Sequence, residues 1–185
     1  MDNGASSYRR FLDGDDKGIA EIVGDYKDGL ILYLNGYVGN IFIAEELTED
    51  TFFRLITKKP RYSGKSTFKS WLYAIGRNVT VDFIRRHSKL LHASIEDMEN
   101  NLSEKESLEH SYIKEESKMR IHRALSELPT DYRIVLWLVF FEGFSNKEAA
   151  IAMKKSDRQI KNLLYRAKQS LKSKLEKEDY IYEEL

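Results

Sequence analysis

Long basic side chains, an amide and an aromatic ring recur from Arg158 to Lys172. Guanidinium and ammonium groups neutralise phosphates, and arginine with guanine or asparagine with adenine are pairings that recognise base edges in the major groove. An apolar stripe at helical spacing should face inward and leave the polar groups outside. The sequence therefore predicts a helix that contacts duplex DNA, although a solvated helix of a bundle would show a similar face. The stripe is Ile160, Leu163, Leu164, Ala167 and Leu171, and the polar candidates are Arg158, Lys161, Asn162, Tyr165 and Arg166.

Two capping boxes position this helix. Ser145 is followed three residues later by Glu148, and Ser156 is followed at the same distance by Gln159. In such a box the serine hydroxyl accepts one backbone N–H, and the acidic or amide side chain accepts the other. Only a few residues around Lys154 remain for a turn, so two short helices must cross steeply. The segment Phe144–Leu175 is thus expected to form a helix-turn-helix.

A second basic and aromatic stretch runs from Pro60 to His87. Residues 60–67 combine proline, serine and glycine and predict a loop, whereas Phe68–His87 has helical periodicity. Aromatic rings interleaved with cations suit unstacked bases, because a base stacks on a ring while the cations hold the backbone. Trp71 and Tyr73 could equally complete a core.

The remaining segments predict further helices. Asp15–Asn35 has helical spacing, with Gly36 and Gly39 expected to interrupt it, and Asn40–Lys59 resumes the pattern. The outer face of the second segment carries acids and an aromatic ring, which could dock a basic partner or simply be solvated. Residues 119–141 are helical around Pro129, with Thr130 the expected cap and Gly143 the expected stop. The acids and ring of the outer face are Glu45, Glu46, Glu49, Asp50 and Phe53.

Charge is segregated along the chain although the total is zero. Residues 1–93, 94–118, 119–174 and 175–185 carry net charges of +2, −5, +7 and −4. Two basic bodies joined by an acidic connector suit two contacts on a polyanion. We expect an all-α fold of two small helical domains joined by a flexible acidic linker. The expected parts are a domain at 1–93, a linker at 94–118, a helix-turn-helix domain at 119–175 and an acidic tail at 176–185.

Composition excludes several classes of protein. The chain has no cysteine, so disulfides and thiolate metal sites are excluded. The longest apolar run, Ile134–Phe141, is far short of the roughly 20 residues that span a bilayer, and the amino terminus lacks a signal-peptide pattern. We expect a cytoplasmic protein with no membrane segment, no cofactor and no metal.

Four segments in register resemble the extracytoplasmic-function (ECF) sigma factors of the sigma-70 family, the promoter-recognition subunits of bacterial RNA polymerase. They are AEELTEDTFFRL at 44–55, STFKSWLYAIGRNVTVDFIRR at 66–86, LSELPTDYRIVLWLVFFEGFSNKEAA at 125–150 and QIKNLLYRAKQSL at 159–171. The resemblance implies that the first domain is region 2, which binds the polymerase clamp and melts the minus-10 element. It implies that the last domain is region 4, which recognises the minus-35 element.

The resemblance also implies roles by position. Core RNA polymerase would be contacted through its largest-subunit clamp coiled coil and its flap, promoter DNA would be bound, and an anti-sigma factor is a further expected partner. The clamp contacts would be Glu46, Leu47, Asp50 and Phe53. The minus-10 contacts would be Arg61, Tyr62, Ser63, Lys65, Ser66, Trp71, Arg77, Asn78, Arg85 and Arg86. The minus-35 contacts would be Ser156, Arg158, Lys161, Asn162, Tyr165 and Arg166.

Two other functions were weighed against this one. The segment GFSNKEAAIAM also resembles the helix-turn-helix of two-component response regulators, but the first ninety residues lack the alternating strands and acidic pocket of a receiver domain. An enzyme is the second alternative. The chain lacks a phosphate-binding loop, an H-E-x-x-H motif and a G-x-S-x-G motif, and its four histidines lack ligand spacing. We therefore do not expect catalysis.

Overall fold

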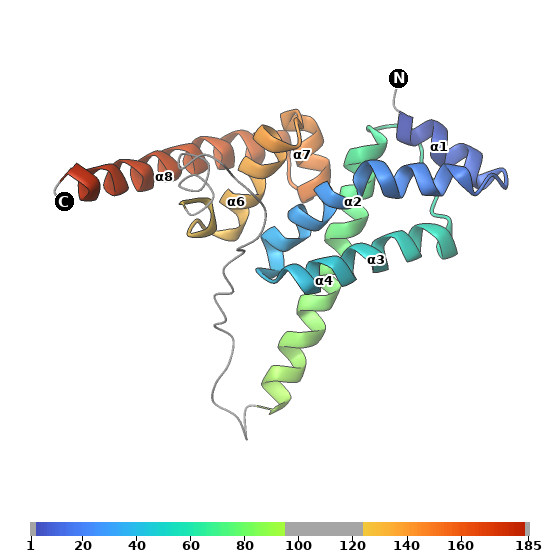
Figure 1. The fold of residues 1–185 in the computed structure, drawn as a ribbon, viewed down its shortest axis with the longest axis horizontal. Coiled ribbons are helices and arrows are strands. Elements are labelled where there is room, and N and C mark those ends of the chain that lie inside the picture. Colours follow the sequence, from blue (N-terminus) through green and yellow to red (C-terminus); the bar gives the residue numbers. More distant parts are fainter. Residues whose placement is uncertain (1–2, 95–123, 184–185) are drawn as a thin grey trace.

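The computed structural model describes residues 3–94 and 124–183, and no strand occurs among them (Figure 1). This confirms the predicted all-α fold, while residues 95–118 of the predicted linker lie outside the described part. The elements are α1 (Asn3–Leu12), α2 (Lys17–Val38), α3 (Ile41–Lys58), α4 (Phe68–Ser94), α6 (Thr130–Leu136), the π-helix η1 (Trp137–Phe141), α7 (Asn146–Met153) and α8 (Asp157–Glu183).

Helices α2, α3 and α4 enclose the core of the amino-terminal half. Leu30, Leu34, Leu55 and Leu72 are fully buried there, and each such side chain contributes about 1.5–3 kcal/mol relative to an exposed one. Buried threonines are satisfied within their own helices, as where the Thr51 hydroxyl donates to the carbonyl oxygen four residues earlier at 2.7 Å. The interior therefore holds α3 and α4 in fixed orientation, with their polar faces outward.

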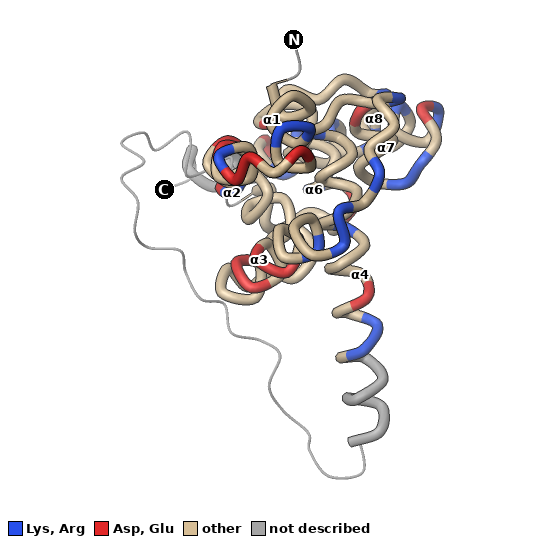
Figure 2. The backbone as a smooth tube through the Cα atoms, turned by 90° about the vertical axis from the view of Figure 1, so that its right-hand side faces the viewer, with Lys and Arg blue, Asp and Glu red and all other residues tan. Residues whose placement is uncertain are grey.

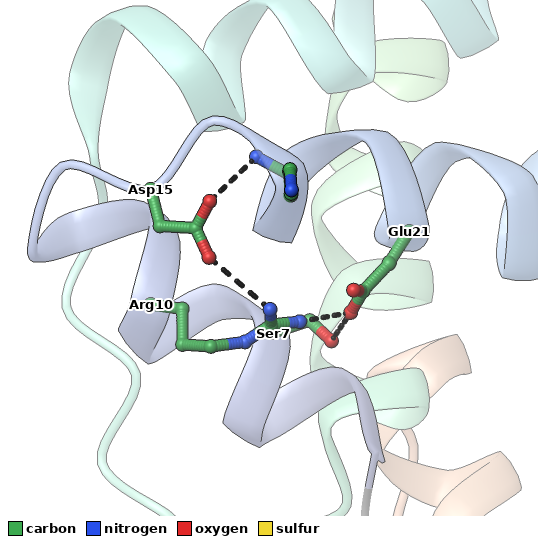
Figure 3. A network of polar contacts seen from close by, with 5 residues as sticks. Ser7, Arg10, Asp15 and Glu21 are labelled. Carbon is green, nitrogen blue, oxygen red and sulfur yellow. Dashed lines mark hydrogen bonds and ion pairs between the residues drawn. The ribbon is translucent and has the colours of Figure 1, made fainter.

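Helix α1 was not predicted from the sequence. It packs on α2 through a corner in which the Arg10 guanidinium lies between Asp15 and Glu21 (Figure 3). Ser7 donates to the same Glu21 carboxylate at 2.6 Å, and the Lys17 backbone N–H donates to Asp15 at 3.0 Å. The corner is a local polar network that fixes where α2 begins.

Three predicted boundaries were wrong. Gly36 does not interrupt α2 but lies inside it, because the helix continues to Gly39, whose left-handed φ of 68° ends it. The N-cap of α6 is Pro129, and Thr130 is the first helical residue. Helix α4 extends beyond His87 to Ser94. The predicted stop at Gly143 holds, since its φ is +70°.

The carboxyl-terminal half packs α6, η1 and α7 against the first turns of α8. Ile134, Leu138, Met153, Ile160 and Ala167 are almost fully buried. Beyond this core, α8 continues outward as a long helix (Figure 1). The exposed face of α8 is therefore supported from below by a packed core.

The two halves also pack against each other. Helix α7 contacts α4 and α6 contacts α2, and the Tyr33 hydroxyl donates to the Ala152 carbonyl oxygen across the contact at 3.1 Å. We call this contact the interdomain interface. It brings together residues more than 60 positions apart in the sequence.

Candidate nucleic-acid interface

Both predicted capping boxes are present and fix the helix-turn-helix. The Ser145 N–H donates to the Glu148 carboxylate at 2.8 Å and the Glu148 N–H donates back to the hydroxyl at 3.3 Å. Ser156 and Gln159 exchange the same two bonds at 2.7 and 3.2 Å. Between the helices Lys154 takes a left-handed φ of 52°, which turns the chain sharply. The two helix starts are therefore rigid.

Every predicted duplex-contacting side chain on α8 is exposed. Tyr165 is 67% exposed, and Asn162 and Arg166 beside it are exposed as well. Lys161 forms an ion pair with Asp157 at 2.9 Å, which a phosphate could replace because both groups are solvated. The exposed candidates are Ser156, Arg158, Lys161, Asn162, Tyr165 and Arg166.

An aromatic cluster supports the predicted loop at residues 60–67. The Tyr8 hydroxyl donates to the Pro60 carbonyl oxygen at 2.8 Å, and burial raises the pKa of Tyr8 to about 12. Tyr62 donates to the Ser66 carbonyl oxygen and packs edge-on against Phe68. The loop is thus held at both ends. Its exposed side chains are Arg61, Ser63 and Lys65, with Ser66 half-buried.

The candidates on α4 divide into covered and open groups. Trp71 is half-buried against the rings of Tyr8, Tyr62 and Phe68, so its ring is partly a structural element. Arg77 and Asn78 are also half-buried, whereas Arg85 and Arg86 are exposed farther along the helix. Among the α4 side chains that the structure describes, the exposed cations are therefore those of its later part.

The predicted polymerase-contacting face of α3 is acidic and partly apolar. Figure 2 shows acidic positions gathered on α3 and basic ones on α4. Glu46 and Asp50 are exposed and Phe53 is 63% exposed. Leu47 differs, since it is only 3% exposed and lies in the core. Leu47 therefore supports this face from below and is not available for direct contact in this arrangement.

An apolar groove lies between η1 and α8 in the carboxyl-terminal half. It has a volume of about 560 Å³ and is lined by side chains of η1 and α8, among them Phe140, Phe141, Leu171 and Leu175. Phe140 and Phe141 are 55% and 47% exposed. Both belong to the π-helix η1, a hydrogen-bonding pattern that often occurs at functional sites.

Comparisons with known proteins place both halves. The family model "Sigma-70 region 2" matches residues 22–90 and "Sigma-70, region 4" matches residues 118–171. The ECF RNA polymerase sigma factor SigM of Bacillus subtilis is 30% identical over 155 residues, covering 84% of this chain and 93% of SigM. The chain belongs to the ECF sigma factors of the sigma-70 family.

Other sigma factors agree with this assignment. SigV of Bacillus subtilis is 28% identical, over 84% of this chain and 89% of that protein. The fold is similar to the sigma factor RpoE of Bartonella quintana, solved with the anti-sigma factor NepR, at a TM-score of 0.68 and 22% identity over 86% and 98% of the two chains. It is also similar to CnrH, solved with the cytosolic domain of CnrY, at a TM-score of 0.62 and 19% identity over 94% and 95%. The family models and the relatives SigM and SigV favour a sigma factor over a response regulator.

The residues of this sigma factor that sequence reasoning missed lie at the interdomain interface. Glu142 binds Lys69 and Tyr73 of α4. Arg133 donates to the Gly36 carbonyl oxygen of α2, and Glu148 accepts a hydrogen bond from Thr67. No local spacing could reveal pairs so distant in sequence. In the described ranges no helix is long and apolar enough to cross a membrane, and no cluster of possible metal ligands is found.

Proposed function

We propose that this sigma factor binds core RNA polymerase and directs initiation at promoters through a minus-10 and a minus-35 element. Residues 119–175 would recognise the minus-35 element and residues 1–93 the minus-10 element, joined by residues 94–118 and followed by an acidic tail at 176–185. The observation that carries the proposal is the exposed row on α8, which starts at a reciprocally capped helix terminus. Such a terminus presents its first turns to a groove.

Minus-35 recognition follows from the chemistry of that row. Arg158, Lys161 and Arg166 are solvated cations, and Asn162 offers an amide that pairs with an adenine edge. Tyr165 adds an exposed ring with a hydroxyl. Ser156, at the start of the helix, would place a hydroxyl beside a phosphate.

Minus-10 recognition is proposed for the loop and for α4. Extruding a base costs a few kcal/mol, and the loop offers exposed cations and hydroxyls on a backbone fixed by Tyr8 and Tyr62. Upstream duplex would follow the open end of α4. The proposed contacts are Arg61, Tyr62, Ser63, Lys65, Ser66, Trp71, Arg77, Asn78, Arg85 and Arg86.

Polymerase binding is proposed for α3 and for the apolar groove. Glu46, Asp50 and Phe53 would meet the clamp coiled coil of the largest subunit, because they combine negative charge with an exposed ring. The groove beside Phe140 would receive the flap. Since the similar sigma factor RpoE was solved with the anti-sigma factor NepR, and CnrH with the cytosolic domain of CnrY, we propose that an anti-sigma factor also binds this chain.

In this proposal the protein acts in the cytoplasm, without catalysis of its own and without a cofactor. Its chemistry is recognition and base extrusion, and phosphodiester synthesis belongs to the polymerase. The test is run-off transcription with purified core polymerase on genomic fragments, followed by mapping of start sites. We expect discrete start sites downstream of a shared pair of elements. Initiation no more specific than that of core polymerase alone would contradict the proposal.

A further inference from the structure

The interdomain interface is centred on the Glu142 carboxylate. Its Oε2 lies 2.7 Å from the Lys69 ammonium and accepts a hydrogen bond from the Tyr73 hydroxyl at 2.8 Å. Lys69 also donates to the Glu142 carbonyl oxygen at 3.0 Å, and the ammonium lies 5.2 Å from the centre of the Phe144 ring. The Glu142 side chain is only 12% exposed. The turn after η1 is thus fixed to α4 through charge, hydrogen bonds and ring contact.

Two glycines of α2 allow the other half to approach this closely. A Cβ at Gly29 would lie 2.8 Å from a Glu142 carboxylate oxygen and 2.5 Å from the Tyr73 hydroxyl, and one at Gly36 would lie 3.1 Å from Ile134. The Gly36 carbonyl accepts two bonds from the Arg133 guanidinium, at 2.7 and 3.2 Å. Glycine in a helix interior is less favourable than alanine. Here the missing side chains make room for the carboxyl-terminal half.

The face of α4 that the interface covers is the one next to the proposed minus-10 site. Lys69, Tyr73 and Arg77 are spaced four residues apart and share one side of the helix. The charge of Arg77 acts on Tyr33 and Tyr37, and Tyr33 in turn bonds to α7. Thr67, the last residue of the loop, donates to Glu148 of α7 at 3.0 Å. The described arrangement therefore places α7 over the start of α4.

We propose that Glu142 is an intramolecular latch that holds the two promoter-binding halves of the free chain closed. The carboxylate pairs with the Lys69 ammonium as a phosphate oxygen would. Closure covers the start of α4 and leaves the exposed face of α8 accessible. Promoter binding at the minus-10 element then requires separation of α7 from α4. The closure itself is independent of DNA, whereas its effect on promoter binding rests on the function proposed above.

Energy transfer between two dyes tests the closure. The chain has no cysteine, so Lys58→Cys on α3 and Gln169→Cys on α8, both exposed, place one dye in each half of the full-length protein. Glu142→Lys sets two ammonium groups against each other and should lower the transfer efficiency. Adding Lys69→Glu reverses both charges and should restore it. Unchanged transfer in Glu142→Lys, with an unchanged melting temperature, would overturn the latch.

Glycine substitutions give an independent arm with a matched control. Gly29→Ala and Gly36→Ala should lower transfer, since the added methyl would meet the Glu142 carboxylate in the first variant and Ile134 in the second, both in the partner half. Gly24→Ala in the same helix should leave it unchanged, because a Cβ there meets nothing within 4 Å. The same effect in all three variants, or in none, would overturn the role of the two glycines.

Binding to a fork-junction DNA with a single-stranded minus-10 region tests the effect of closure. If the closed state exceeds the open one tenfold, Glu142→Lys should strengthen binding about tenfold, because apparent affinity scales with the competent fraction. Binding to a minus-35 duplex alone should not change. Opening without a gain on the fork junction would overturn the covering of α4. Failure of every variant to bind either DNA would instead contradict the proposed function and leave the transfer result standing.

Discussion

The two proposed DNA-binding faces differ in access. On α8 the cations, the amide and the ring are solvated, whereas on the first half of α4 the candidates Trp71, Arg77 and Asn78 are half-buried and the neighbouring Lys69 is engaged by Glu142. Both faces are basic and aromatic in sequence. The difference shows that side-chain type gives the chemistry of a surface, and that the packing of distant elements decides whether it is available.

The largest expected effect concerns a third face, the open acidic side of α3. Asp50→Arg should weaken association with core polymerase by about 2 kcal/mol or more, the size found at interface hot spots, because it places a cation against a basic partner. A pull-down with purified core polymerase measures it. Asp28→Arg, an equally exposed reversal on α2, is the control. Equal retention of polymerase by both variants would remove Asp50 from the contact.

The open face of α8 should respond directly to mutation. Arg166→Ala should weaken binding to a minus-35 duplex by about 1–3 kcal/mol if its guanidinium contacts a base edge. Anisotropy titrations at matched salt measure the loss, with Lys27→Ala on α2, exposed in the other half, as control. Undiminished binding by Arg166→Ala would exclude the contact.

The covered face of α4 should respond only after opening. Arg77→Ala should change fork-junction affinity more in the Glu142→Lys background than in the wild type, because Tyr33, on which the charge of Arg77 acts, is bonded to Ala152 of α7 while the halves are closed. If Arg77 contacts a phosphate, the salt slope should also fall by about 1 in the open background. Equal losses in both backgrounds would mean that the two faces do not differ in access.

The helix start beneath the α8 face should affect stability. Ser156→Ala removes the hydroxyl that accepts the Gln159 N–H and should lower the free energy of unfolding by about 1 kcal/mol. Chemical denaturation measures it, with the exposed Ser173→Ala as control. Identical unfolding curves would show that the second capping box contributes nothing to the rigidity of this face.

The smallest expected effect is a pH dependence at the interface. Partial burial opposes ionisation of Glu148, but hydrogen bonds from Ser145 and Thr67 outweigh it and lower its pKa below the ordinary 4.5. A lowered folded-state pKa stabilises the fold above the unfolded-state value, and this is lost as pH falls through the folded-state value. Unfolding of the wild type should therefore lose stability below about pH 4.5 more steeply than Glu148→Gln. Parallel pH profiles would contradict this.

The sequence was sufficient where the determinants are local. Ser145 with Glu148 and Ser156 with Gln159 predicted the helix-turn-helix, and helical periodicity predicted α2, α3 and α4. The sequence was insufficient where the role of a residue depends on a contact with a residue far away in the chain. Gly36 looked like a helix break because glycine usually weakens helices, but Arg133 and Ile134, nearly a hundred residues later, explain its place.

The candidate site divides in the same way. Exposure of the α8 row follows from its apolar stripe, which the sequence contains. The burial of Leu47 and the half-burial of Trp71 depend on packing among α1, α3 and α4, which no local pattern specifies. The hydrogen bond that holds the start of the loop at residues 60–67 could not be predicted from the sequence either, because Tyr8 and Pro60 are 52 positions apart.

The π-helix η1 lies between the apolar groove and the interdomain interface. Its last bond joins the Glu142 N–H to the Trp137 carbonyl oxygen at 3.1 Å, a span of five residues. Phe141, the last residue of η1, lines the groove, and Glu142, the next residue, binds Lys69. A ligand that altered the hydrogen bonding of this turn would therefore act on both surfaces at once.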